Sequence, residues 1–372
     1  MGGTPCSRPH PRSGAPTTTG PSRAGRDERH RAEPGLPSIR RIGARMTTTS
    51  SPEPATTGPT TAGARLALAV DLGGTKVEAA LVSDAGVVLP ATRFRSPTGP
   101  GRTSEELQAA VDQVVTNALA ALPADAELVG VGVGSAGPVD EQHGLVSPLN
   151  MPVWRGYPLR DRVAAHVPAG VPVTLRMDGL AITLAEHWVG AAQGHDHVMG
   201  MIVSTGVGGG LILHGRTVSG PTGNAGHIGH VECGGYDDPC ACGGTGCLEA
   251  VASGPKTVAW ARRQGFTGTT GEELAAAYAA GDEVAVAAVR RSGRALGQAI
   301  ASAASLVDLE VVAIGGGFSH VSPDLFAYAR EAVAERVEFG FVTKVQIVPT
   351  GLSQDGPLIG AAALVHRADV LR

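Results

Sequence analysis

The chain has 372 residues, of which 42% are hydrophobic and 17% charged, and its formal net charge is −4. The length suits two domains and the composition is that of a soluble globular protein. The weak negative charge gives no electrostatic reason to expect nucleic acid or an anionic membrane as a partner, and no apolar run approaches the about 20 residues of a membrane span. We therefore expect a cytoplasmic protein that acts on small molecules.

Residues 1–64 differ from the rest because they are rich in Pro, Thr, Ser, Gly and Arg and lack apolar periodicity. Such a composition buries too little apolar surface to fold, so we expect a disordered N-terminal extension. Arg40-Arg41 is not followed by an apolar segment, which argues against an export signal. Met46 begins a shorter leader, and whether residues 1–45 reflect an upstream-extended start codon stays open.

From residue 65 onward, short apolar runs alternate with glycine turns and helical segments. Apolar runs bounded by turn residues predict strands at 66–71, 77–82, 87–94, 128–133, 197–204, 211–213 and 310–314. The first three are expected to be antiparallel. Apolar residues at helical spacing predict helices at 103–122, 183–192 and, in pieces, 254–306.

The order strand, glycine turn, strand occurs twice, at 66–82 and at 198–213. This repeat predicts a duplicated α/β unit with a cleft between the halves. We expect a small α/β domain over 65–180 and a large α/β domain over 181–372, with the C-terminal helix packing back on the small domain.

Two glycine turns carry residues that suit phosphate binding. The first, residues 71–76 (DLGGTK), has an aspartate at the strand end, two glycines, a hydroxyl and a lysine. Exposed backbone N–H groups bind anions and a carboxylate can bind Mg²⁺, although the P-loop spacing is absent and an ordinary hairpin turn fits equally well. The second, residues 204–210 (STGVGGG), is similar, and two such turns across a cleft would bind a polyphosphate from both sides.

Two other features are ambiguous. Gly132, Gly134 and Gly137 match a dinucleotide-binding fingerprint, but Pro138 follows, so no helix starts there and we do not expect a nicotinamide site. Asp178 precedes a predicted helix, and the sequence alone leaves open whether it caps that helix or has a catalytic role.

A histidine and three closely spaced cysteines predict a metal site: His230, Cys240, Cys242 and Cys247. One imidazole and three thiolates form the closed tetrahedral set of structural zinc, and the glycines between them allow a tight wrap. The alternatives are a disulfide or a chance clustering, and a Cys-x-Cys pair is poorly placed to bridge to itself. The site would make the loop that bears Glu249 rigid. His227 either faces a ligand or is an ordinary surface histidine.

Together these motifs resemble the ROK family of sugar kinases and sugar-responsive repressors, most closely its bacterial glucokinase-type members. The resemblance covers about residues 66–370 and includes the two glycine turns, residues 134–140 (GSAGPVD), Asn150, Gly229-His230, the cysteine cluster with Glu249, and residues 315–317 (GGG). It implies the actin/hexokinase-like fold, a duplicated ribonuclease H-like α/β unit with an interdomain cleft. The implied reaction is ATP-dependent phosphorylation of a hexose at its 6-hydroxyl, with ATP, Mg²⁺ and structural Zn²⁺ as cofactors.

The resemblance also assigns roles to residues. Asp178 corresponds to the catalytic base. The positions that would bind ATP and Mg²⁺ are Asp71, Gly73, Gly74, Thr75, Lys76, Thr205, Gly206 and Gly208, with Gly315 and Gly316 against the adenosine. The positions that would contact the sugar are Asn150, Met177, Asp178, His227, His230 and Glu249. A homodimer or homotetramer is implied as well.

Two positions depart from the family pattern. Met177 stands where the family has an asparagine that binds the sugar's 3-hydroxyl, and His227 stands where it has a glutamate. An unpaired sugar hydroxyl would cost about 1–3 kcal/mol, so a modified hexose such as the aminosugar kanosamine becomes a candidate beside glucose. The alternatives are an ordinary glucokinase or a non-catalytic sugar-binding regulator, although residues 1–64 show no helix-turn-helix pattern of a repressor.

Overall fold

The computed structural model describes residues 63–99, 101–352 and 354–371. The predicted disordered extension lies outside these residues up to residue 62 and stays a prediction. The described chain belongs to one compact unit, Thr57–Arg372. Division of that unit into domains at residue 180 also stays a prediction.

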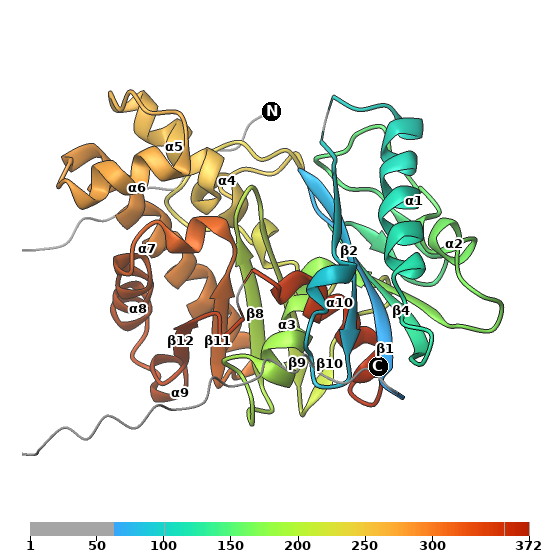
Figure 1. The fold of residues 1–372 in the computed structure, drawn as a ribbon. Helices are drawn as coiled ribbons and strands as arrows, with labels where there is room; N and C mark the ends of the chain where they lie inside the picture. The colour runs from blue at the N-terminus through green and yellow to red at the C-terminus, as the bar shows by residue number, and fades with distance from the viewer. Residues whose placement is uncertain (1–62, 100, 353, 372) are drawn as a thin grey trace, which may run out of the picture. The chain divides into compact units, whose positions relative to one another are not determined.

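Two five-stranded sheets with the same topology form the framework (Figure 1). The first has the order β3 (Phe94–Pro97), β2 (Lys76–Ser83), β1 (Arg65–Leu72), β4 (Glu127–Ser135) and β7 (Val173–Met177). The second has the order β10 (Arg216–Thr217), β9 (Val207–Leu213), β8 (Val198–Val203), β11 (Val311–Gly315) and β12 (Gln346–Pro349). In both, three antiparallel strands are followed by two parallel ones. The predicted duplication is confirmed.

The remaining strands and the helices connect and cover these sheets. A two-stranded hairpin, β5 (Val139–Asp140) and β6 (Leu145–Val146), follows β4. The helices are α1 (Ser104–Ala120), α2 (Leu159–Ala164), α3 (Asp178–Val189), α4 (Leu248–Ala252), α5 (Gly254–Arg263), α6 (Gly271–Ala279), α7 (Glu283–Val307), α8 (Asp324–Arg336), α9 (Gly340–Thr343) and α10 (Gly356–His366). Single 3₁₀ turns occur at Pro90–Thr92, Ile228–His230 and Gly317–His320. Among the described residues, no helix is both long and apolar enough to cross a bilayer.

The start of α1 follows directly from its sequence. Thr103 accepts the backbone N–H of Glu106, and Glu106 accepts the N–H of Thr103 in return, which is a complete capping box. Leu107, Val111 and Val114 then form the buried face that packs on the first sheet. The predicted helix over 103–122 is confirmed.

Two predictions of secondary structure are corrected. Residues 87–94 were expected to form a strand, but Pro90 begins a 3₁₀ turn and only Phe94 belongs to β3. Proline lacks the N–H that a ladder needs, which accounts for the interruption. The helix expected over 183–192 begins earlier, at Asp178, and ends at Val189.

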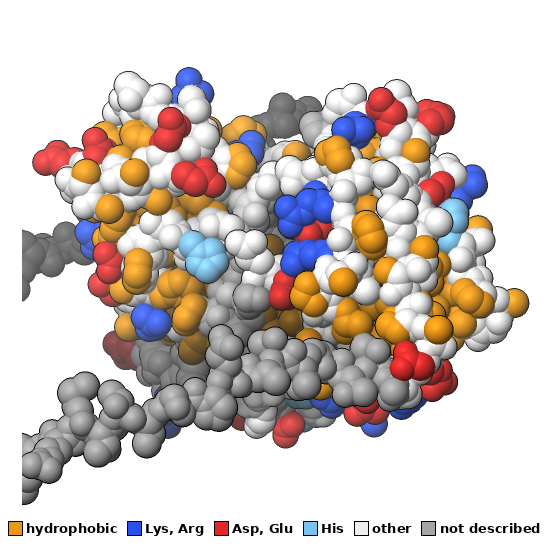
Figure 2. Space-filling model, viewed as in Figure 1, with side chains coloured by type: hydrophobic (Ala, Val, Ile, Leu, Met, Phe, Trp, Pro, Cys, Tyr) orange, Lys and Arg blue, Asp and Glu red, His pale blue; other side chains and the backbone are white. Residues whose placement is uncertain are grey.

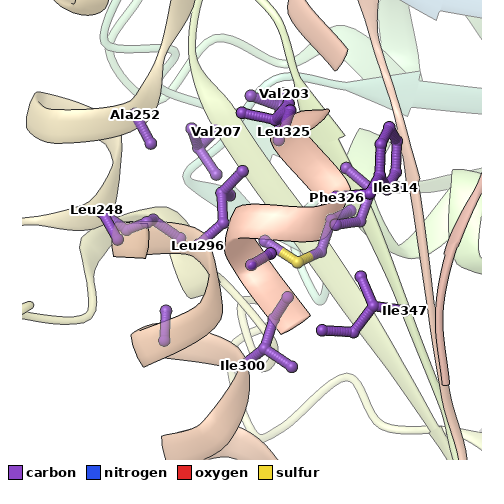
Figure 3. Packing of buried hydrophobic residues seen from close by; sticks show 14 of the residues in the cluster. Val203, Val207, Leu248, Ala252, Leu296, Ile300, Ile314, Leu325, Phe326 and Ile347 are labelled. Atoms are coloured by element: carbon purple, nitrogen blue, oxygen red, sulfur yellow. The ribbon is translucent and has the colours of Figure 1, made fainter. Parts of the chain in front are cut away.

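Two helices connect the sheets. The chain passes from β7 through α3 to β8, and from β12 through α10 to the C-terminus, and α3 and α10 lie side by side between the sheets (Figure 1). α3 packs on β8 and β9, whereas α10 packs on β1 and β4. On its other face the second sheet is covered by α7 and α8. Figure 3 shows that core, in which strand residues meet helix residues: Val203, Ile314, Ile347, Leu296, Ile300 and Phe326.

A buried carboxylate joins the two connecting segments. Glu186 of α3 is 1% exposed, and its Oε2 accepts the backbone N–H groups of Ala191 at 2.8 Å and Gly351 at 3.2 Å. Its Oε1 accepts the hydroxyl of Thr350. Because Thr350 and Gly351 follow β12 directly, this side chain fixes the chain where it leaves the second sheet for α10.

Replacing Glu186 by alanine should therefore lower the free energy of unfolding by about 2–4 kcal/mol, because buried N–H groups lose their partner and a cavity forms. Denaturant titration followed by circular dichroism measures the change. Glu127→Ala is the matched control, since that glutamate is 69% exposed and its pair with Arg65 spans 3.8 Å. Equal midpoints for the two variants would contradict the anchoring role.

Candidate active site

A cavity of about 280 Å³ opens between the two halves and is lined by residues of both. Its lining includes most of the positions that the sequence singled out: Asp71, Gly73, Gly74, Thr75, Lys76, Asn150, Asp178, Thr205, Gly206, Gly208, His227, His230 and Glu249. Both glycine turns and the candidate base thus share one cavity. Met177, Gly315 and Gly316 do not line it.

Asp178 occupies the first turn of α3, immediately after β7. A Cβ atom on Gly179 would lie 2.3 Å from the carbonyl oxygen of Gly209, so only glycine permits this approach of helix to strand. The Asp178 carboxylate accepts the Gly179 N–H at 2.7 Å, and the same oxygen lies 3.7 Å from where a Cβ on Gly208 would be. The carboxylate therefore lies directly beside the second glycine turn.

Burial shapes the acidity of the two aspartates that line the cavity. Burial raises the pKa of Asp178 to about 6, with a further rise from the charge of Glu249 and an opposing effect of the Gly179 N–H. Burial also raises the pKa of Asp71 to about 7, with repulsion from Asp178 adding and Lys76 opposing. A carboxyl whose pKa lies near 6 suits a base that works near neutral pH.

The first glycine turn is held on both sides. On one side, a Cβ on Gly74 would lie 2.1 Å from Nδ2 of Asn150, so the bare glycine lets that amide pack directly on the turn. The Oδ1 of Asn150 is buried and has no partner among the described residues. On the other side, the ammonium of Lys76 pairs with Glu78.

The buried carboxylate of Glu78 forms ion pairs with three basic side chains, of which Lys76 is one. It is 1% exposed and also binds Arg93 at 3.1 Å and Arg95 at 2.8 Å. Burial opposes its ionisation, but the hydrogen bonds from Lys76 and Arg95 hold the pKa of Glu78 below its ordinary value. Arg93 also forms an ion pair with Asp355, which lies just before α10, at 2.6 Å. Basic and acidic side chains gather near the middle of the face shown in Figure 2.

The predicted metal ligands come together. The ligand atoms of His230, Cys240, Cys242 and Cys247 all lie within 4.8 Å of one another. Cys240 Sγ is 3.6 Å from His230 Nδ1, and Cys242 Sγ is 3.6 Å from Cys247 Sγ. With bonds of about 2.3 Å to sulfur and 2.0 Å to nitrogen, ligands of a tetrahedral zinc lie about 3.5–3.8 Å apart, and these two separations match that spacing. The cysteines are free thiols, and the disulfide alternative is wrong.

This cluster is joined to the cavity through α4. Cys247 immediately precedes that helix, and Glu249 lies in its first turn. Glu249 accepts the N–H of Val207 at 3.0 Å and so contacts the second glycine turn. His230 belongs to both places, since its ring lines the cavity and its Nδ1 faces Cys240.

His227 faces the opposite half of the molecule. Its ring centre is 4.7 Å from that of His230, and its Nδ1 is buried with no partner among the described residues. Burial lowers the pKa of His227 to about 4, so the imidazole is neutral. Its Nε2 and the Met177 sulfur lie 3.5 Å and 3.2 Å from where a Cβ on Gly137 would be. Met177 is 1% exposed and lies outside the cavity lining, so its side chain is not where a sugar-contacting residue was expected.

Gly315 and Gly316 lie next to the cavity without lining it. A Cβ on Gly316 would be 2.6 Å from the carbonyl oxygen of Val203, so this turn packs on the end of β8, one residue before Ser204. The sequence reasoning also missed several lining residues: Ala136, Gly137, Leu149, Ile202, Val207 and Pro357. Gly137 lies in a motif already noted, whereas Ile202 and Pro357 carry no chemical signal of a site.

Comparison with known proteins agrees with this geometry. The model of the ROK family matches residues 67–368. The chain is 32% identical over 315 residues to the glucokinase of Thermotoga maritima, covering 80% of this chain and 96% of that one. It is 31% identical over 300 residues to the N-acetylmannosamine kinase of Yersinia pseudotuberculosis, covering 79% and 96%.

A solved structure extends the likeness to three dimensions. The crystal structure of a ROK family glucokinase from Streptomyces griseus in complex with glucose and AMPPNP superposes with a TM-score of 0.70 at 30% identity, covering 81% of this chain and 99% of that one. The actin/hexokinase-like α/β fold expected from the sequence is confirmed. The matched motifs, the duplicated sheets and the shared cavity lead to one conclusion, that this chain belongs to the ROK family.

Proposed function

We propose that the protein is a sugar kinase that transfers the γ-phosphate of ATP to the 6-hydroxyl of a hexose. The observation that carries this proposal is the position of Asp178, whose carboxylate lines the same cavity as both glycine turns. ATP use is supported by the nucleotide analogue bound to the Streptomyces griseus relative. Hexose use is supported by relatives that are kinases of glucose and N-acetylmannosamine.

In the proposed reaction, Asp178 accepts the proton of the 6-hydroxyl as that oxygen forms a bond to the γ-phosphorus and the bond from that phosphorus to the β–γ bridging oxygen breaks. Backbone N–H groups of the two glycine turns that have no partner within the protein, with Thr75 and Lys76, would bind the phosphates. The carboxylate of Asp71 fits Mg²⁺, which when bound would neutralise phosphate charge.

The sugar end of the cavity presents mainly hydrogen-bond acceptors. Asn150 offers a buried, unpartnered Oδ1, and Asp178 and Glu249 contribute carboxylates. The lining cation Lys76 is paired with Glu78. Acceptors of this kind favour a ligand rich in donors, which supports an aminohexose, such as kanosamine, as substrate. An ordinary glucokinase is the alternative, and a non-catalytic regulator would lack phosphoryl transfer altogether.

A screen of ADP release decides among these functions. The sugars compared are glucose, mannose, N-acetylglucosamine, N-acetylmannosamine, glucosamine and kanosamine. The highest kcat/KM should belong to an aminosugar. A clear preference for glucose would make the protein an ordinary glucokinase, and no ADP release with any of them would refute the kinase function.

Asp178→Asn should lower kcat by about two or more orders of magnitude while leaving sugar binding largely intact, because the amide cannot accept the proton. In the unmodified protein, kcat should fall as the pH drops through about 6, where the raised pKa of Asp178 lets the base become protonated. Asp84→Asn, at an exposed turn after β2, is the matched control. Full activity of Asp178→Asn would remove this carboxylate from the mechanism.

We also propose that the His230–cysteine cluster binds a structural zinc ion. Cys242→Ser should lose the metal and loosen the loop that bears Glu249, seen as lower zinc content by atomic emission and a higher sugar KM. Cys233→Ser is the matched control, because this buried thiol lies outside the cluster. Unchanged zinc stoichiometry in Cys242→Ser would show that the cluster is not the metal site.

Substitution toward the family pattern tests how the sugar is recognised. The measured quantity is the ratio of kcat/KM for glucose to kcat/KM for the best sugar of the unmodified protein. The double variant Met177→Asn with His227→Glu should raise this ratio about fivefold or more, since a carboxylate accepts two hydroxyls at once. Most of this gain should come from His227→Glu, because Met177 is buried outside the cavity. An unchanged ratio in the double variant and in both single variants, Met177→Asn and His227→Glu, would mean that these positions do not select the sugar.

A further inference from the structure

Two segments from opposite halves meet beside the sugar end of the cavity. Residues 137–141 follow β4 of the first sheet, and residues 222–227 follow β10 of the second. Here their contact is called the seam. At its centre, Asn224 Oδ1 accepts the N–H of Val139 at 2.9 Å, and Asn224 Nδ2 donates to the carbonyl of Val139 at 2.7 Å.

This pairing resembles one rung of an antiparallel ladder. A carboxamide carries one acceptor and two donors, so it can exchange two hydrogen bonds with a single residue as a neighbouring strand would. The second donor of Asn224 is shared with Thr222, through its carbonyl at 3.3 Å and its hydroxyl at 3.2 Å. The amide is thus held in one orientation.

Neighbouring contacts tie the seam to the strand that leads to the base. The N–H of Glu141 lies 3.4 Å from the carbonyl oxygen of Thr222, to which it donates. The Glu141 carboxylate binds Arg176 at 2.6 Å, two residues before Asp178. A Cβ on Gly223 would lie 2.8 Å from that of Glu141, so the two segments pack without space between them.

One end of the seam lies at the cavity. Gly137, at one end of the first segment, and His227, at the end of the second, both line it. The Nε2 of His227 lies 3.5 Å from where a Cβ on Gly137 would be. Any shift of one segment against the other therefore changes the width of the cavity at this end, whereas the two glycine turns belong to other parts of the chain.

We propose that Asn224 is a positioning residue that sets the width of the sugar end of the cavity by joining the two halves at Val139. This inference rests on the proposed sugar kinase function. It assigns Asn224 an effect on sugar binding and little effect on nucleotide binding.

Asn224→Ala should raise the KM for the sugar about tenfold, the scale expected for two lost hydrogen bonds, with the KM for ATP changed less than about twofold. Glucose and glucosamine serve as probes, by ADP release and by titration calorimetry. Asn224→Asp should act in the same direction, because its second oxygen faces the carbonyl of Val139 instead of donating to it. Asn117→Ala on α1 is the matched control and should leave both constants unchanged.

Hydrogen exchange at the Val139 amide gives an independent measure, and it should become faster in Asn224→Ala. Faster exchange with an unchanged sugar KM would overturn the proposal, as would equal rises in both KM values or unchanged exchange. If the unmodified protein binds a sugar but releases no ADP, the kinase function is refuted and the proposal for Asn224 is not. The dissociation constants for the sugar, measured by calorimetry, then test the role of Asn224. If it binds neither probe, both proposals fail.

Discussion

The direct contact between the start of α3 and the glycines of β9 is the constraint on which the site depends. A side chain on Gly179 would collide with the Gly209 backbone, so the helix and the strand fix one another at backbone distance. Thr183 strengthens this contact, because its hydroxyl donates to the carbonyl of Gly179 at 2.7 Å and accepts the N–H of Gly200 at 3.2 Å. The result is a carboxylate whose position relative to the second glycine turn is set by main-chain geometry and so does not depend on flexible side chains.

The same contact explains the electrostatics of the cavity. Asp178 lies where helix meets strand and is partly buried, and this burial is the main reason that its pKa rises to about 6. Asp71 lies near the end of β1, and its burial together with repulsion from Asp178 brings its pKa to about 7. Burial makes these two carboxylates costly to ionise, and a cationic or hydrogen-bond-donating ligand beside them would lower that cost. Ionisation of these carboxylates is thus coupled to the charge of whatever occupies the cavity.

Sequence patterns predicted the parts of the site that depend on local chemistry. An apolar run ending in a glycine turn is enough to place Asp71 and Thr205, and ligand type and spacing are enough to group His230 with Cys240. Patterns failed where local preference competed with sheet pairing, as at Pro90. No pattern indicates that tertiary packing buries the Met177 side chain outside the cavity lining. The pairing of Val139 with Asn224 joins residues 85 positions apart and leaves no periodic signal at either one.

The two halves are linked by a strong contact through α3 and α10 and by a weak one through the seam. α3 and α10 are mostly buried apolar helices that pack on each other and on both sheets. Glu186, which is 1% exposed, adds buried hydrogen bonds to this contact. The seam consists of a few hydrogen bonds at its partly exposed edge, each contributing about 1 kcal/mol net because water competes for the same groups. Separation at the seam therefore costs far less than separation at the helices. The packed helices are therefore the strong link between the halves, and the contact of Asn224 with Val139 is the weak one.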